Sequence, residues 1–181
     1  MLGPCLNATG RLDTADHALA LFEAEDTAEA ARIAGDLKDM NDSRKELTLA
    51  GVEEAIAQIE GSNLEKDDVL VVYLPDVHES LAGIIAGRIR EKYNKPAFVL
   101  TRAEEGVKGS GRSIDAFHMY DEMTKCKQLF TKYGGHKLAA GVSMPEENVE
   151  EFRRQINGNS HLTKDDFEEK VLIDVPIPMS Y

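Results

Sequence analysis

A strand–helix–strand pattern between residues 69 and 100 constrains the fold of this chain more than any other feature. The run Val69-Leu70-Val71-Val72-Tyr73 is apolar and rich in β-branched residues, as expected for a strand buried on both faces. Pro75-Asp76 ends this strand, and an apolar-periodic helix that Ser80 can cap continues to Tyr93. Asn94-Lys95-Pro96 then turns the chain into a second strand at 97–100. The sequence therefore predicts an α/β domain with a mainly parallel sheet and flanking helices.

The flanking segments predict a helical connector before this unit and a short extension after it. Leu12–Glu23 and a longer segment beginning at Thr27 have helical periodicity, and the longer one fits either one arm-like helix or two stacked helices. After the second strand we expect a glycine-rich segment at 106–113, a helix at 115–132, a strand at 140–144, a helix at 146–156 and a strand at 171–175.

This pattern predicts three parts. They are a helical connector at 1–65, an α/β domain at 66–158, and a linker with the first strand of a truncated further domain at 159–181.

The distribution of charge favours a polyanionic ligand for the middle of the chain, although the net charge is −12. Residues 1–65 contain 5 basic and 14 acidic residues, whereas residues 88–138 contain 11 basic and 6 acidic ones. No apolar run approaches the roughly 20 residues of a membrane span, and no secretory signal begins the chain. The two cysteines have no CxxC spacing, so a disulfide framework is not expected and the cytoplasm is the expected compartment.

Two motifs carry candidate binding chemistry. In Lys108-Gly109-Ser110-Gly111-Arg112-Ser113, glycines allow close backbone approach, Ser110 and Ser113 offer hydroxyl groups, and Arg112 offers a planar fork for phosphate oxygens. A solvated β-turn would explain the same segment. In Gly134-Gly135-His136, the histidine can bond a phosphate or leaving group, and a helix C-cap followed by a surface histidine is the alternative.

Metal ligands are not expected in this chain. His78-Glu79 resembles the start of a zinc-binding HExxH motif, but position 82 is Ala, and Asp16-His17 has no neighbouring partner. The sequence contains neither a DxD nor a DHH motif. We therefore expect no cofactor within these residues.

Taken in order, these motifs resemble those of a known family. The four elements are Asn7-Ala8-Thr9-Gly10-Arg11-Leu12, Ala82-Gly83-Ile84-Ile85-Ala86-Gly87-Arg88-Ile89, the 108–113 segment, and Gly134-Gly135-His136 through Gly141. Together they are similar to the DHH-associated domain of RecJ-like single-stranded-DNA-specific exonucleases, of the DHH phosphoesterase superfamily. The resemblance covers residues 6–156.

The resemblance implies a substrate-binding fragment of a 5′→3′ exonuclease of DNA repair and recombination. It implies that Ser110, Arg112, Ser113, Gly134 and Gly135 bind substrate phosphate with help from Arg11, and that His136 assists catalysis. Manganese or magnesium ions, held by an N-terminal DHH domain, would perform hydrolysis in the parent protein. The expected partners are therefore single-stranded nucleic acid and that domain, with no membrane. The ending, 172–175, is similar to the entry into an oligonucleotide-binding barrel.

Two alternatives stay open from the sequence. One is a DHH phosphodiesterase that acts on short oligoribonucleotides or cyclic dinucleotides, against which the long connector argues. The other is a non-catalytic replication scaffold with a RecJ-like fold, against which the two intact motifs argue.

Overall fold

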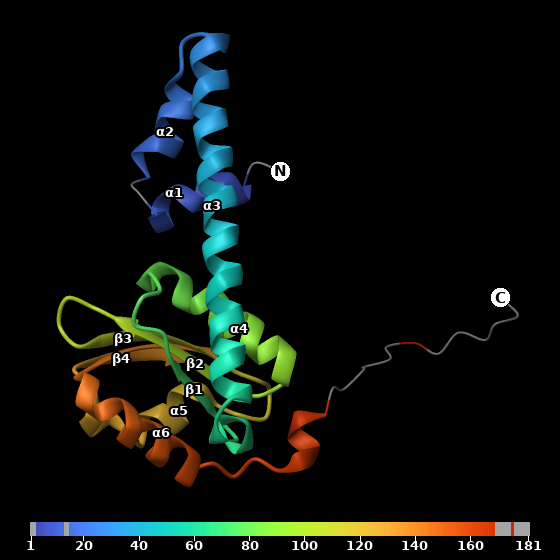
Figure 1. Ribbon diagram of the computed structural model, residues 1–181, viewed down its shortest axis with the longest axis vertical. Helices are drawn as coiled ribbons and strands as arrows, with labels where there is room; N and C mark the ends of the chain where they lie inside the picture. Colours follow the sequence, from blue (N-terminus) through green and yellow to red (C-terminus); the bar gives the residue numbers. More distant parts are fainter. Residues whose placement is uncertain (1–2, 13–14, 169–174, 176–181) are drawn as a thin grey trace, which may run out of the picture.

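The computed structural model describes residues 3–12, 15–168 and 175, and it contains a five-stranded sheet with helices on both faces (Figure 1). The order of strands across the sheet is β1-β2-β3-β5-β4. Their bounds are Leu70–Tyr73 for β1, Ala97–Arg102 for β2, Val107–Arg112 for β3, Lys132–His136 for β4 and Ala139–Met144 for β5. The α/β class is confirmed.

The strand–helix–strand unit has the expected form. Helix α4 (Ala82–Tyr93) connects β1 to β2, and these two strands are parallel. The other three pairs, β2–β3, β3–β5 and β4–β5, are antiparallel, so the sheet is mixed rather than mainly parallel. The reason is the length of the connections. A turn with Gly106 at φ 71° joins β2 to β3, and two residues join β4 to β5, which is too short for a parallel crossover.

Three helices precede the sheet: α1 (Gly3–Leu12), α2 (Asp16–Glu23) and α3 (Thr27–Glu60). Helix α3 is one continuous helix of 34 residues, which decides between the two expected arrangements. Asp26 caps its start, because the Asp26 carboxylate accepts a hydrogen bond from the Glu29 amide (2.8 Å). Helix α1, which contains the Asn7–Arg11 motif, was not predicted. None of the helices that the structure describes is both long enough and apolar enough to cross a membrane.

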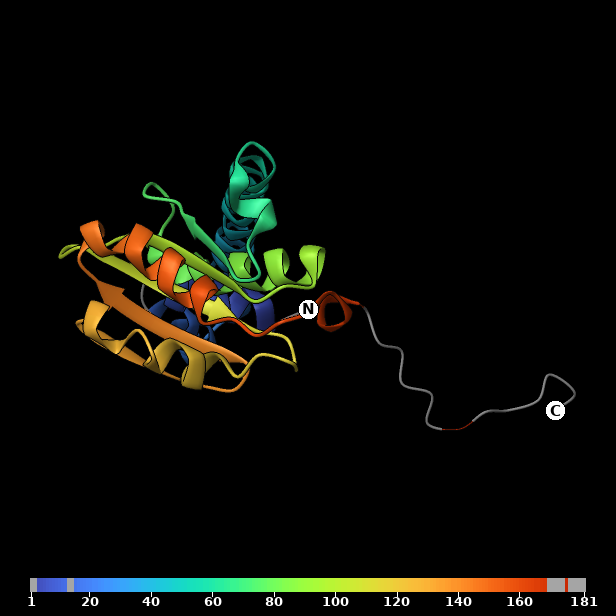
Figure 2. The same cartoon turned by 90° about the horizontal axis from the view of Figure 1, so that it is seen from below.

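Helices lie on both faces of the sheet (Figure 2), and a hydrophobic core lies on each face. On one face, α4 lies over β2 and β3 and the end of α3 lies against β1, and Ala55, Ile59, Ile85, Ile89 and Val72 share one buried cluster. On the other face lie α5 (Met119–Thr124), a 3-10 turn at Lys127–Leu129, and α6 (Val149–Gly158). The helix expected at 115–132 is therefore shorter, and α6 begins three residues later than predicted.

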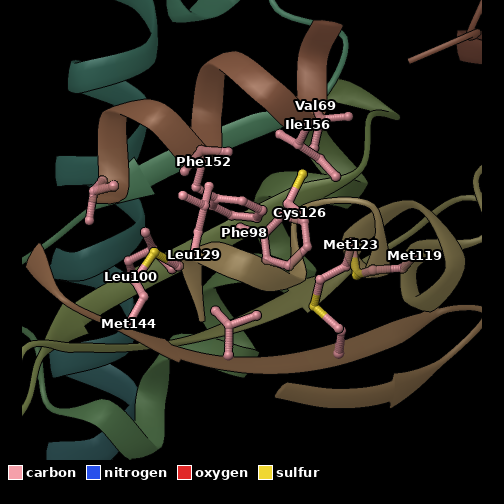
Figure 3. Packing of buried hydrophobic residues seen from close by; sticks show 14 of the residues in the cluster. Val69, Phe98, Leu100, Met119, Met123, Cys126, Leu129, Met144, Phe152 and Ile156 are labelled. Atoms are coloured by element: carbon pink, nitrogen blue, oxygen red, sulfur yellow. The ribbon is translucent and has the colours of Figure 1, made fainter. Parts of the chain in front are cut away.

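Phe98 explains the glycines of β3. Its buried ring packs edge-on against Phe152 of α6, with ring centroids 5.1 Å apart (Figure 3). Phe98 is directly opposite Gly111 in the sheet, and a Cβ added at Gly111 would lie 2.7 Å from the Phe98 ring. Gly109 is likewise opposite Leu100. The segment that we interpreted as a glycine-rich loop is thus a central strand, and its glycines make room for large neighbours on this face.

Side-chain amides cap the outer edge of β1. Asn157 of α6 accepts a hydrogen bond from the Val69 amide and donates one to the Val69 carbonyl oxygen (both 2.9 Å). Gln58 of α3 donates to the carbonyl oxygen of Tyr73 (3.0 Å). The backbone groups that an edge strand would expose are therefore bonded at both ends of β1.

After α6 the chain continues through a 3-10 turn at Lys164–Phe167. The Asn94 side chain donates a hydrogen bond to the Phe167 carbonyl oxygen (2.7 Å), which attaches this segment to the end of α4. The strand expected at 171–175 lies, except for Val175, outside the described residues.

Candidate functional site

The half of the sheet that includes β3, β5 and β4 presents a face that is open except where the start of α4 lies against β3. Alternate residues of a strand point to the same side, so the register fixes which side chains share this face. Three rows cross it: Lys108–Ser143–Lys132, Ser110–Gly141–Gly134 and Arg112–Ala139–His136. The sheet therefore brings together Ser110, Arg112, Gly134 and His136 from the two predicted motifs. We refer to these three rows as the open face.

The middle row of the open face forms a hollow because two of its three residues, Gly141 and Gly134, have no side chain. No described heavy atom lies within 4 Å of a Cβ built at Gly134, and at Gly141 the nearest one is the Gly109 carbonyl oxygen at 3.9 Å. A cavity of about 350 Å³ occupies this region. It is lined by Glu79, Ser80, Lys108, Gly109, Ser110, Lys132, Tyr133, Gly141, Val142 and Ser143.

Lys108 and Lys132 make one end of the open face basic. The Lys108 ammonium lies 2.8 Å from Oε2 of Glu79, which belongs to a 3-10 turn at Glu79–Leu81 before α4. The hydrogen bond from Lys108 to Glu79 holds the pKa of that lysine above its usual value. Lys108 is therefore cationic at neutral pH.

Arg112 makes the other end basic, and the start of α4 shapes its position. The Arg112 guanidinium donates from Nη1 to the Gly111 carbonyl oxygen (2.8 Å). A Cβ added at Gly83 would lie 2.8 Å from Nη2 of Arg112 and 3.5 Å from the Cβ of Ser110. The absent side chain at Gly83 is what allows the guanidinium to pack against α4.

His136 lies at the end of the exposed edge strand β4. Its Nδ1 accepts a hydrogen bond from the Leu138 amide (3.3 Å). In the neutral imidazole this assigns the proton to Nε2, which can donate to an anionic oxygen placed over the open face.

The two neighbouring glycines of β4 have different roles. Gly134 belongs to the open face, whereas Gly135 points to the opposite side with φ 159°. A Cβ added at Gly135 would overlap the Ala139 carbonyl oxygen and lie 2.7 Å from the Cα of Ala140. The structure thus gives Gly135 a role in the β4–β5 hairpin and leaves only Gly134 on the open face.

Two other predicted residues lie apart from the open face. Ser113 is buried, and its hydroxyl group donates to the Phe117 carbonyl oxygen (2.7 Å), so it supports the loop after β3. Arg11 lies in the last turn of α1, and its side chain is outside the described part of the chain. Its neighbours Asn7, Thr9 and Gly10 line a second cavity of about 470 Å³ together with Ser80. Since Ser80 also lines the first cavity, α1 adjoins the open face.

Sequence reasoning assigned no role to Lys108, Lys132 or Ser143. Lys108 precedes Ser110 by two residues, and Lys132 precedes Gly134 by two, so the period of a strand would have placed each pair on one face. The signal was missed because 106–113 was interpreted as a glycine-rich segment and Lys132 as the end of the helix expected at 115–132.

A metal site does not fit these residues. Among residues 3–12, 15–168 and 175, no group of three or more His, Cys, Asp or Glu side chains could hold a metal ion. The open face offers ammonium, guanidinium, hydroxyl and imidazole groups, which suit anionic oxygens rather than divalent cations.

Comparisons with known proteins agree with the motifs. The DHHA1 domain family matches residues 66–159. The RecJ single-stranded-DNA-specific exonuclease of Bacillus subtilis is 34% identical over 170 residues, which are 92% of this chain and 22% of that protein. The RecJ of Escherichia coli is 36% identical over 162 residues, which are 85% of this chain and 28% of that protein. The chain thus spans about a quarter of the length of these relatives.

Solved structures give the same relationship. RecJ of Thermus thermophilus in complex with Mg²⁺ has a TM-score of 0.78 at 29% identity, over 87% of this chain and 24% of that one. An exonuclease RecJ bound to manganese has a TM-score of 0.79 at 30% identity, over 90% of this chain and 40% of that one. The chain therefore belongs to the DHHA1 domain family and is a relative of the RecJ exonucleases.

Proposed function

We propose that this chain is the substrate-binding part of a RecJ-like 5′→3′ exonuclease, and that its open face binds the phosphate backbone of single-stranded DNA. The observation that carries the proposal is the arrangement of the three rows. One end of the open face carries Lys108 and Lys132, and the other end carries Arg112 and His136. Between them lies the cavity over the row that contains Gly141 and Gly134. Cationic groups along an open groove suit a flexible polyanion.

The metal ions of the longer protein would then be held by a DHH domain outside these residues, because the described part of the chain offers no ligand set for them. Residues 1–65 would be the connector to that domain, residues 66–158 the substrate-binding domain, and residues 159–181 the start of a further one. The comparison structures with Mg²⁺ and manganese support metal dependence of such a longer protein.

Within the open face, Ser110 and Arg112 would clamp a phosphate while Gly134 lets the backbone approach the sheet. Arg11 would assist from α1, which adjoins the open face at Ser80. His136 would donate from Nε2 to the scissile phosphate. Its donation would strengthen as charge develops on the phosphate oxygens.

Equilibrium binding of a labelled twelve-residue oligothymidylate to the 181-residue chain tests this proposal. We expect a Kd on the order of 10⁻⁴ to 10⁻⁶ M that weakens as salt rises, because binding releases counterions. Arg112→Ala should weaken binding about tenfold, and Arg112→Lys should restore it only partly because the planar fork is lost. Arg154→Ala is the matched control, since Arg154 lies on α6 and is 72% exposed. Salt-independent binding, or equal effects of Arg112→Ala and Arg154→Ala, would contradict the proposal.

A further inference from the structure

An acidic residue lies at the basic end of the open face. Glu79 is the only acidic side chain that lines the cavity in the described part of the chain, and its Oε2 lies 2.8 Å from Nζ of Lys108. Both side chains are about half exposed. Lys132, in the same row, has no carboxylate within 4 Å among the described residues.

Stability does not explain this ion pair. Half-exposed pairs contribute little to folding, because water solvates both partners well when they separate. The position of the pair points to ligand binding instead. A carboxylate oxygen on an ammonium group takes the place that a phosphate oxygen would take.

The two basic ends of the open face are too far apart for one phosphate. Lys108 and Arg112 are four residues apart along β3, which separates their Cα atoms by about 13 Å. A mononucleotide can therefore contact one end only, whereas an oligonucleotide can reach both. A ligand that stays at Ser110 and Arg112 leaves the Glu79–Lys108 pair intact.

We propose that Glu79 is a specificity-determining residue that holds the place of a phosphate on Lys108, so that only a ligand long enough to span the open face must displace it. This inference rests on the proposed function and adds that binding at the open face depends on the length of the ligand. When a strand binds, a Lys108–phosphate pair replaces the Lys108–Glu79 pair. When the strand moves on, Glu79 pairs with Lys108 again, so the ammonium group is not left unpaired. Glu79 thereby lowers the affinity of the open face for a long strand and makes it easier for that strand to move along the face.

Binding to two probes tests this role. Glu79→Gln should raise the affinity for oligothymidylate of twelve residues about threefold, which corresponds to the small contribution of a half-exposed pair. Its salt dependence should become steeper by about 0.7 in the logarithmic slope, because Lys108 then presents one more uncompensated positive charge to the single strand. The affinity for thymidine 5′-monophosphate, measured by NMR titration, should stay unchanged. In a Lys108→Gln background, Glu79→Gln should have no effect on either probe.

Controls separate this inference from a general effect of charge and from the proposed function. Glu150→Gln removes the same charge from α6, where the carboxylate is 84% exposed, and should leave both probes unaffected. Glu79→Ala should act in the same direction as Glu79→Gln, and thermal melts should show both variants folded. If Glu79→Gln strengthens both probes equally, or if its effect persists without Lys108, the inference is wrong while Arg112-dependent binding upholds the proposed function. If Arg112→Ala leaves oligonucleotide binding unchanged, the proposed function fails and the inference fails with it.

Discussion

Arg112 and His136 lie on the same side of the sheet because both are in register with Ala139. Arg112 is opposite Ala139 across the β3–β5 pair, and His136 is opposite it across the β4–β5 pair. A guanidinium and an imidazole that are 24 positions apart in the sequence thus become neighbours across a single alanine. A small residue at this position leaves room for a ligand oxygen between the two side chains.

The first prediction concerns His136 in the longer protein. His136→Ala should lower kcat on single-stranded DNA by about 10²-fold, the usual effect of losing one preorganised donor, and should change KM little. Steady-state kinetics of the two proteins measure this split. A thermal melt provides the control, since the exposed His136 should not affect folding. An increase in KM with kcat unchanged would show that His136 only binds the ground state.

The second prediction compares the adjacent glycines of β4. Gly135→Ala should destabilise the chain by about 1–3 kcal/mol, because its backbone conformation and the Ala139 carbonyl oxygen both oppose a side chain. Gly134→Ala should not destabilise it, since that position is open. It should instead weaken oligonucleotide binding by filling the hollow. Chemical denaturation and the binding assay on both variants provide the test, and equal stability losses would contradict the assignment.

The third prediction concerns Gly83, which positions Arg112. A Cβ at this site meets mainly the end of a flexible guanidinium, which can move away at little cost to stability. Gly83→Ala should therefore retain the thermal stability of the chain while it weakens oligonucleotide binding several-fold. Gly87→Ala, one turn along α4 and with no described heavy atom within 4 Å of the added Cβ, is the matched control. If Arg112→Ala abolishes the difference between Gly83→Ala and its parent, the effect acts through Arg112.

The fourth prediction concerns Cys126, whose burial raises the pKa of its thiol from 9.0 to about 11. Between these two values the unfolded chain loses the thiol proton and the folded chain retains it. The thiol's contribution to stability is therefore present below pH 9 and is lost as the pH rises to 11. The loss should be on the order of 2 kcal/mol.

Denaturation of the parent and of Cys126→Ala at about pH 8 and about pH 10.5 measures that contribution. The parent should lose more stability than the variant over this interval, because only the parent carries the buried thiol. Equal losses would assign the alkaline destabilisation to other groups. Alkylation offers a second check, since native Cys126 should remain unmodified at about pH 8 and react on unfolding.

The parts of the fold that the sequence predicted are those with strong local signals. Val69–Tyr73 and 97–100 are apolar runs, the first followed and the second preceded by turn residues, so both strands and the helix between them were expected correctly. Gly109 and Gly111 gave a misleading local signal. Glycine is needed at these positions because Leu100 and Phe98 on the neighbouring strand fill the space that a side chain would occupy. This contact between strands cannot be inferred from the local sequence around the glycines.

The candidate site was predicted in composition but not in arrangement. Ser110, Arg112 and His136 were identified as candidates from their chemistry and their resemblance to a family. Their common face depends on the antiparallel register of β3, β5 and β4, which the sequence does not specify. Ser113 was grouped with them for its hydroxyl group, yet this group bonds the Phe117 carbonyl oxygen in the interior.

The amide caps on β1 have a consequence for self-association. An uncovered edge strand can pair with the edge of another copy and so begin a continuous intermolecular sheet. Asn157 already bonds the amide and carbonyl oxygen of Val69, and Gln58 bonds the carbonyl oxygen of Tyr73, so β1 offers a second copy fewer backbone groups to pair with. Of the two edges of the described sheet, the β4 edge is then the uncovered one, and Lys132 places a charged side chain on it, which disfavours close pairing with another copy. Concentrated solutions of this chain should therefore resist aggregation through strand pairing. Loss of the Asn157 side chain would leave the backbone groups of Val69 free to pair with a second copy.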